Sequence, residues 1–360
     1  MKIYGTVDIY ITKKFLGTFF YAIALIISIA VVFDVSENLD EFLSKDIPGM
    51  AIITDYYFNF IPYFANLFSP LFTFIAVIYF TSKMAYNTEI IAILSSGVSY
   101  SRLMRPYLVS AMVLAAFSYM LGGYVIPPAN KTLNDFRQTY IDNNTRVSNE
   151  RNIHRQIEPG VYIYMQSFNA SNVGYRFTME VFDNMKLVEK ITADNIRWDE
   201  ESGKWVINNW WKRKIYEEHE EFEKGYRMDT TLNMKPDDFK VMKNEMESFT
   251  TPALKKEIKL MKMRGVNTVE WEIERHKRAA NPFSAFILTL IGAGLASRKI
   301  KGGLGLHLGL GLLLSFSYIL FMQISTVFAI SGNTPPIIAV WIPNLFYSII
   351  AFFVFRWAAR

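Results

Sequence analysis

The chain has 360 residues, of which 51% are hydrophobic and 16% aromatic, and its mean hydropathy is +0.14. This composition is too apolar for one ordinary soluble domain, whereas 20% charged residues are too many for a bundle made only of membrane spans. The net charge of +5 does not indicate nucleic-acid binding, because the charges are sorted by loop, and the lack of cysteine excludes disulfides, thiolate metal sites and cysteine nucleophiles.

Six apolar runs follow an amphipathic N-terminal segment. Residues 1–14 mix apolar and charged side chains and precede no cleavage site, so we expect an interfacial helix and no signal peptide. A bilayer core requires about 20 apolar residues per helix. The runs that approach or exceed this length are residues 15–33, 52–82, 103–126, 283–297, 304–330 and 337–357. We predict six transmembrane helices in two groups of three, within residues 1–127 and 283–360.

Loop charges orient these spans. One set of loops is acidic, at residues 34–46, or uncharged, at residues 331–336. Basic residues cluster in the other set: Lys2, Lys13, Lys14, Lys83, Arg102, Arg105, Arg298, Lys299, Lys301, Arg356 and Arg360. Because Lys and Arg gather in cytoplasmic loops, we predict that both termini are cytoplasmic and that residues 128–250 face outward.

Residues 128–250 change character. Short segments rich in β-branched and aromatic residues, at 161–166, 174–182, 191–198 and 204–216, alternate with turn-like segments. This spacing is typical of an antiparallel sandwich or jelly roll. Residues 251–282 return to helical periodicity and predict an amphipathic connection. The predicted fold class is therefore a membrane α-helical bundle of six transmembrane helices with an inserted extracytoplasmic all-β jelly-roll domain.

The segment at residues 84–97 lies between two spans and predicts a short amphipathic cytoplasmic helix. Its expected apolar face consists of Ile90, Ile91, Ile93 and Leu94, Glu89 lies near its start, and Gly97 is expected to end it. Such a helix is either an ordinary surface element with a solvated Glu89 or a coupling helix. In the second case its apolar face fills a groove of a cytoplasmic ATPase and Glu89 pairs there with a basic residue.

Glycines crowd the predicted fifth span. Gly302 precedes Gly305 and Gly309, which have the small-xxx-small spacing of closely packed membrane helices. The glycines serve either packing within this chain or a seam against a partner. Lys131 and Arg137, which follow the third span, are either solvated or bind an anionic lipid headgroup, since arginine engages phosphate through paired donors.

Motifs for catalysis are missing from the chain. It contains no G-x-x-x-x-G-K-[ST], so it does not hydrolyse ATP by that route. The H-E-x-x-H and G-x-S-x-G motifs are also absent. We therefore expect a chain that is not an enzyme. A membrane scaffold that displays a β-domain for protein contacts remains an alternative to a transport subunit.

Several segments spread over the chain resemble the paired permeases of lipopolysaccharide export in Gram-negative envelopes. NTEIIAILSSGVS, at residues 87–99, is similar to the coupling helix of that family, and YVIPPANKTLNDFR, at 124–137, to its exit from the third span. MKPDDF, at 234–239, resembles the re-entry segment, and NTPPIIAVWIPNLFYSIIAFF, at 333–353, the last span. The last span favours the G-type paralogue over the F-type.

The resemblance implies a permease subunit of an ABC transporter in the bacterial inner membrane. Its implied partners are a cytoplasmic ATPase dimer, a paralogous permease, a periplasmic jelly-roll bridge protein and lipopolysaccharide. ATP and Mg²⁺ would be bound by the ATPase, and this chain would hold no cofactor. The first and fifth spans would form a lateral gate. Family members carry basic residues after the first span, but here only Lys45 stands among acidic residues, so Lys131 and Arg137 are the stronger candidates for the headgroup.

Overall fold

The computed structural model describes residues 5–44, 47–141, 151–169, 171–239, 245–263, 266–298 and 303–359. Two compact units make up the chain. The helical unit comprises Met1–Ile141, Met246–Lys255 and Val269–Arg360, and the β-unit comprises Asp142–Glu245 and Lys256–Thr268. The predicted site residues Lys45 and Gly302 lie outside the described residues.

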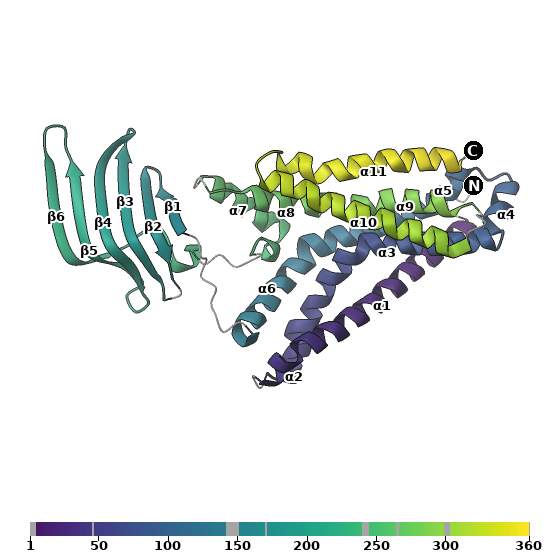
Figure 1. Ribbon diagram of the computed structural model, residues 1–360, viewed down its shortest axis with the longest axis horizontal. Coiled ribbons are helices and arrows are strands. Elements are labelled where there is room, and N and C mark those ends of the chain that lie inside the picture. The colour runs from purple at the N-terminus through teal and green to yellow at the C-terminus, as the bar shows by residue number, and fades with distance from the viewer. Residues whose placement is uncertain are drawn as a thin grey trace. The chain divides into compact units, whose positions relative to one another are not determined.

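The first half of the helical unit is built on three long helical runs (Figure 1). Its elements are α1 (Thr6–Ser44), α2 (Gly49–Ala51), η1 (Ile52–Tyr57), α3 (Phe58–Tyr86), α4 (Glu89–Ser95), α5 (Tyr100–Met120), η2 (Leu121–Val125), α6 (Ile126–Phe136) and η3 (Arg137–Ile141). With 39 residues, α1 is about 60 Å long, twice the bilayer core of about 30 Å. It therefore joins the expected interfacial segment and the first span into one helix.

The second half contains one bent span and two straight ones. Its elements are η5 (Glu245–Ser248), α8 (Val269–Ala280), α9 (Phe283–Ala296), α10 (Gly303–Ile330) and α11 (Pro336–Ala358). Helix α7 (Thr251–Met263) begins in this unit, and its residues from Lys256 onward belong to the β-unit. With 14 residues, α9 measures about 21 Å and does not cross a bilayer alone. It follows α8 at a 48° bend, where Pro282 interrupts the helical hydrogen bonds. The described residues thus contain five apolar spans, or six when α8 and α9 count as one.

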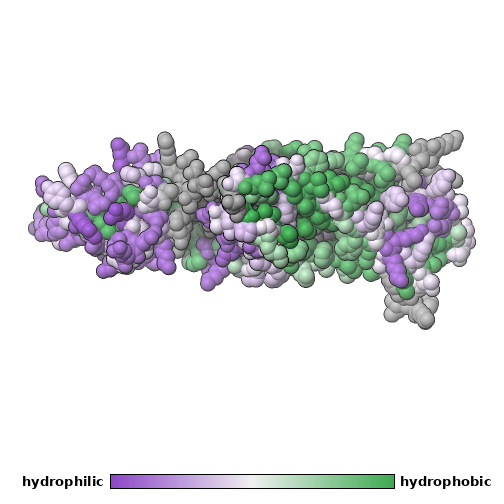
Figure 2. All heavy atoms as spheres, turned by 90° about the horizontal axis from the view of Figure 1, so that it is seen from below, coloured by the Kyte–Doolittle hydropathy of each residue, from purple (hydrophilic) through white to green (hydrophobic). Residues whose placement is uncertain are grey.

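Helix α3 is the centre of the helical unit, where it contacts α1, α6, α9 and α10. Small residues allow the close approach, as expected in membrane bundles. A Cβ added to Gly311 of α10 would lie 2.5 Å from Ile78 Cδ1, and one added to Gly292 of α9 would lie 3.0 Å from Phe74. Apolar side chains cover the surface of the helical unit between more polar ends (Figure 2), as a membrane span requires.

The β-unit is one six-stranded antiparallel sheet. Its strands are β1 (Arg151–Glu158), β2 (Val161–Phe168), β3 (Val173–Asp183), β4 (Lys186–Asp199), β5 (Lys204–Ile215) and β6 (Glu220–Thr230), with the 3₁₀ turn η4 (Pro236–Phe239) after them. Each strand pairs with its sequence neighbours, because tight turns such as those at Gly160 and Gly203, both with positive φ, leave no room for a crossover. The described strands thus form a meander where we expected jelly-roll connectivity.

A small aromatic core closes one face of this sheet. Trp205 and Phe177 are fully buried, and Phe239 of η4 packs against them with 1% of its surface exposed. The Trp205 indole N–H donates to the Met234 carbonyl at 2.9 Å, which satisfies the polar edge of the buried ring. The predicted fold class is confirmed at this level: a helical protein with five to six apolar spans and an inserted antiparallel β-domain.

Candidate functional site

The predicted coupling segment is a tight turn followed by a two-turn helix. Helix α3 continues to Tyr86, and α4 spans only Glu89–Ser95. Thr88, at the N-cap, has a φ of +60°, a left-handed conformation that reverses the chain. Glu89 lies in the first turn, where the helix dipole favours a negative charge. Gly97 ends the segment with a φ of +89° and donates its N–H to the Leu94 carbonyl at 3.1 Å, as a C-terminal glycine does.

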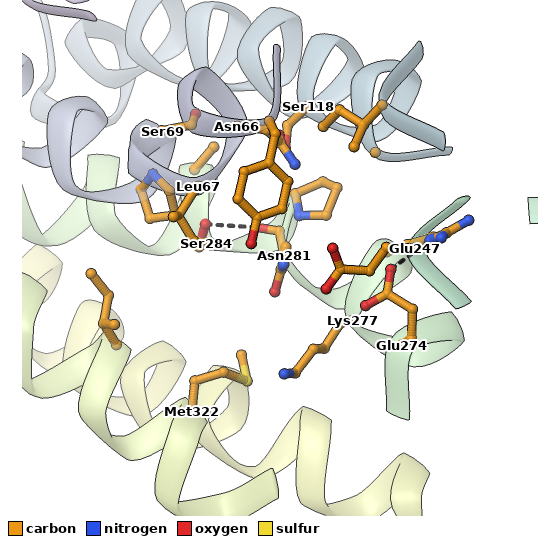
Figure 3. A pocket seen from close by; sticks show the side chains of 18 of the residues that line it. Asn66, Leu67, Ser69, Ser118, Glu247, Glu274, Lys277, Asn281, Ser284 and Met322 are labelled. Atoms are coloured by element: carbon orange, nitrogen blue, oxygen red, sulfur yellow. Dashed lines mark hydrogen bonds and ion pairs between the residues drawn. The ribbon is translucent and has the colours of Figure 1, made fainter. Parts of the chain in front are cut away.

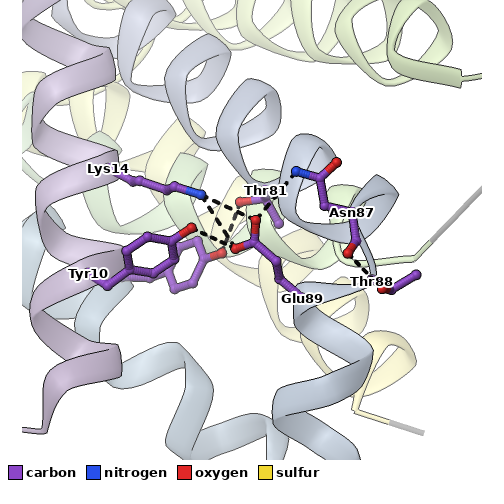
Figure 4. Close-up of polar contacts among 7 residues, drawn as sticks. Tyr10, Lys14, Thr81, Asn87, Thr88 and Glu89 are labelled. Atoms are coloured by element: carbon purple, nitrogen blue, oxygen red, sulfur yellow. Dashed lines mark hydrogen bonds and ion pairs between the residues drawn. The ribbon is translucent and has the colours of Figure 1, made fainter.

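Glu89 is held by the first helix of the chain (Figure 4). The Tyr10 hydroxyl donates to Glu89 Oε2 at 2.8 Å, and Lys14 Nζ lies 3.4 Å from the same oxygen. Asn87 donates to Oε1 at 3.5 Å. Partial burial raises the pKa of Glu89, but the hydrogen bonds and the Lys14 charge outweigh it and place the pKa below the usual value. The carboxylate is thus fully ionised and ties α4 to α1.

The apolar face of α4 points into the chain's own core. Ile90 is 1% exposed, and Ile93 and Leu94 pack half-buried against the same cluster as Phe15 of α1. The side that is open to a partner carries different residues. These are Tyr86, Asn87, Thr88, Ile91, Ala92 and Ser95. Helical periodicity alone did not reveal which apolar face is buried, because the adjacent residues Ile90 and Ile91 point about 100° apart around the helix axis.

A second ion pair fixes the start of α1 and was missed at the level of sequence. Arg102, in the first turn of α5, donates to both oxygens of Asp8 at 2.7 and 2.6 Å. Asp8 is 3% exposed and also accepts from the Gly5 N–H at 2.7 Å. The available signal was a lone carboxylate among apolar residues near the N-terminus. This bidentate pair fixes the start of α1 and thereby the position of Tyr10 and Lys14, which follow within the next two turns.

Of the predicted headgroup residues, the structure describes Lys131 and Arg137, and these two lie on different sides of their helical run. Arg137 donates to the Tyr56 hydroxyl at 3.2 Å, and that hydroxyl donates to Asp34 at 3.2 Å. Arg137 therefore belongs to a network that joins η3, η1 and α1. Lys131 is exposed on α6, six residues earlier, so it points to another side of the same helical run.

The glycines of α10 divide into two groups. A Cβ added to Gly305 or Gly309 would meet no atom of the described chain within 4 Å, whereas Gly311 packs against α3. The face that carries Gly305 and Gly309 is therefore open. Other exposed apolar side chains follow this helix and α1: Phe20, Tyr21, Val32, Phe33, Leu313, Phe316, Leu320, Ile324 and Val327.

Comparison with protein families accounts for this arrangement. Residues 9–357 match the family described as lipopolysaccharide export system permease LptF/LptG. No curated protein matches the chain. The match covers both groups of spans, the β-unit and α4, and it does not distinguish LptF from LptG. The family comprises permease subunits of an ABC transporter, which are not themselves enzymes and span the inner membrane several times. The chain belongs to the lipopolysaccharide export system permease LptF/LptG family.

Proposed function

We propose that this subunit turns ATP hydrolysis in a separate ATPase dimer into movement of α1, and that this movement expels lipopolysaccharide from a cavity between two permeases. The observation that carries the proposal is the bond between Glu89 of α4 and Tyr10 and Lys14 of α1. A partner that displaces α4 necessarily pulls on α1 through this contact. The long, unbroken helix then transmits the displacement across the bilayer.

The ATPase contact uses the exposed side of α4. Ile91 is 53% exposed and Tyr86 66% exposed, and both flank the turn that carries Glu89. An apolar side chain beside a carboxylate fits a groove with a basic rim, as in other helix-in-groove contacts. ATP and Mg²⁺ are bound by the ATPase in this proposal, and this chain supplies only the lever.

The orientation follows from the charges and the helix ends. Figure 1 shows both chain termini at the same end of the helical unit as α4. Lys14, Lys83, Arg102 and Arg356 belong to helices that reach this end, and Arg298 follows the last residue of α9. Such basic residues favour the cytoplasmic side. We place α4 and both termini in the cytoplasm and the β-unit in the periplasm.

Pairing with a paralogous permease uses the open face of α10. Gly305 and Gly309 carry no side chain and an added Cβ would meet no atom of the described chain within 4 Å, which permits close backbone approach by another helix. The exposed apolar rows on α1 and α10 supply the two sides of such a seam. A seam of this kind opens laterally to admit lipid, which is the gate that the proposal requires.

The β-unit delivers the lipid to a periplasmic bridge protein. Among the described strands, β1 and β6 are the edges of the sheet. The unpaired backbone N–H and C=O groups of an edge strand can pair with a further strand. A bridge of similar β-fold can extend the sheet by strand addition. This step places the subunit between the membrane and the bridge.

The test is Glu89→Ala in the complex of both permeases and the ATPase, reconstituted in liposomes. Lipopolysaccharide release is expected to fall about tenfold or more, as for loss of a coupling contact worth about 1–3 kcal/mol. ATP hydrolysis is expected to continue without transport. Glu41→Ala, which removes an exposed carboxylate near the other end of α1, serves as the matched control. Unchanged release by the Glu89 variant would contradict the proposal.

A further inference from the structure

The helical unit contains a polar cavity that the proposed lever does not use (Figure 3). It has a volume of about 310 Å³ and lies among α3, α6, α8, α9, α10 and η5. Its charged end is formed by η5 and α8, and its apolar end by Leu67 of α3 and Ile319 and Met322 of α10. Leu67 is 51% exposed, so the apolar end is open toward the surroundings of the bundle.

Arg278, the arginine that lines this cavity, is hydrogen-bonded within the chain. Arg278 donates to Glu274 at 2.7 Å and to the carbonyls of Phe249 and Met246 at 2.6 and 3.1 Å. It therefore fastens η5 to α8 and uses three of its five N–H donors in these contacts. With 7% of its surface exposed, Arg278 is a structural residue.

Glu247 and Lys277 are the charges without a matched partner. Within the described residues, Glu247 accepts one long hydrogen bond, from Asn130 at 3.4 Å. Its carboxylate lies beside that of Glu274, and Lys277 extends into the open part of the cavity toward Met322 (Figure 3). Within the described residues, no hydrogen bond or ion pair of the Lys277 side chain is found, although its main-chain carbonyl accepts from the Asn281 N–H at 2.8 Å. The cavity thus presents a carboxylate pair on one side and an ammonium group on the other.

Because the cavity presents carboxylates on one side and an ammonium group on the other, it favours a ligand that carries a positive and a negative charge. Burial, and then the charge of Glu274, raise the pKa of Glu247 to about 7, because the ionised form is poorly compensated. A cation with N–H donors removes that deficit, whereas an uncharged ligand does not. Lys277 offers a complementary point charge to an anion. A metal ion fits less well, because the described residues contain no group of three metal-ligating side chains.

We propose that this cavity binds the phosphoethanolamine headgroup of a lipid, with its ammonium at Glu247 and Glu274 and its phosphate at Lys277. The acyl chains leave past Leu67, Ile319 and Met322. A primary ammonium suits the carboxylates because it donates three hydrogen bonds. The same group can belong to a bilayer phospholipid or to a substituted lipopolysaccharide, and only the second source depends on the proposed transport function.

The experiment measures lipid retention by the full chain, purified in detergent and incubated with equal amounts of three phospholipids. Phosphatidylethanolamine is expected to be retained about tenfold over phosphatidylcholine, because the trimethylammonium keeps the charge but donates no hydrogen bond. Phosphatidylglycerol, which lacks the ammonium, is expected to bind weakly too. Equal retention of phosphatidylethanolamine and phosphatidylcholine would overturn the proposal.

Variants separate the two ends of the headgroup. Glu247→Gln keeps the size and the Asn130 contact, and is expected to reduce the preference for phosphatidylethanolamine to about onefold to twofold. Glu270→Gln, exposed on the same helix α8, is the matched control and should retain the preference. Lys277→Met is expected to weaken phosphatidylethanolamine retention. If Lys277→Met instead strengthened it, Lys277 would be the natural partner of Glu247, and the proposal would be wrong.

A second arm distinguishes the source of the headgroup. Lipopolysaccharide with and without phosphoethanolamine is compared in the same assay, again with wild type and Glu247→Gln. Preference for the substituted form that vanishes in the variant assigns the site to the exported lipid, and preference for phosphatidylethanolamine alone assigns it to the bilayer. Unchanged transport by Glu89→Ala would contradict the proposed function and leave both retention measurements unaffected, so the two proposals fail separately.

Discussion

Two glutamates of the helical unit, Glu89 and Glu247, are both partly buried, but they differ in how many partners compensate the carboxylate charge. Glu89 accepts hydrogen bonds from Tyr10 and Asn87 and pairs with Lys14, and its pKa lies below the usual value. Glu247 is more buried, accepts one long bond from Asn130, and has a pKa raised to about 7. A carboxylate with several partners holds two elements together. One with few partners is available to a ligand.

The largest expected effect tests whether Glu89 acts through α1. Glu89→Lys places like charges beside Lys14 and is expected to lower lipopolysaccharide release by more than about tenfold. The double change Lys14→Glu with Glu89→Lys restores opposite charges and should recover docking of α4 on α1. Because the chain has no cysteine, cross-linking between cysteines introduced into α1 and α4 reports that docking directly.

The rate of lipopolysaccharide release by this double variant decides whether Glu89 acts through α1. Recovery of both docking and release supports the lever from α4 to α1. Recovery of docking without release would show that Glu89 acts only through its contact with the ATPase, and would contradict the proposed transmission through α1.

A smaller effect is expected from Tyr10→Phe. This change removes the 2.8 Å hydrogen bond to Glu89 and leaves the Lys14 pair. Because the contact is partly exposed, its loss is worth about 1 kcal/mol, or about fivefold in coupling. The measurement is ATP hydrolysed per lipid released. Tyr21→Phe, on the same helix and 73% exposed, is the control and should not change this ratio.

The smallest effect concerns stability at Glu247. A carboxyl group whose pKa is raised by folding stabilises the fold while protonated, and this contribution is lost as the pH rises from about 4.5 to about 7. The charged groups that act on it are Glu274, Arg278 and Lys277 of α8, and the neutral phenol of Tyr63 of α3 lines the same cavity. In Glu247→Gln the apparent Tm in detergent should fall less over this pH interval than in wild type. Identical pH profiles would show that Glu247 is well compensated.

Much of the architecture was predictable because it depends on local pattern. Apolar length identified the straight spans, and a change to short β-branched segments identified the inserted β-domain. The bent span was harder, since α9 alone has only 14 residues. The meander also escaped prediction, because strand order depends on which tight turns close and not on strand composition.

The sequence by itself determined that this is a multi-pass membrane protein with a β-insert and a short helix between its second and third spans, because these features arise from runs of neighbouring residues. Only the tertiary structure decided which face of that helix is buried and that Glu89 is bound from 79 and 75 residues away. It also decided that Glu247 lines a cavity in which it accepts a long hydrogen bond from Asn130. The hydrogen-bond partners and the burial of a side chain depend on how distant segments pack together, and a local sequence pattern does not determine that packing.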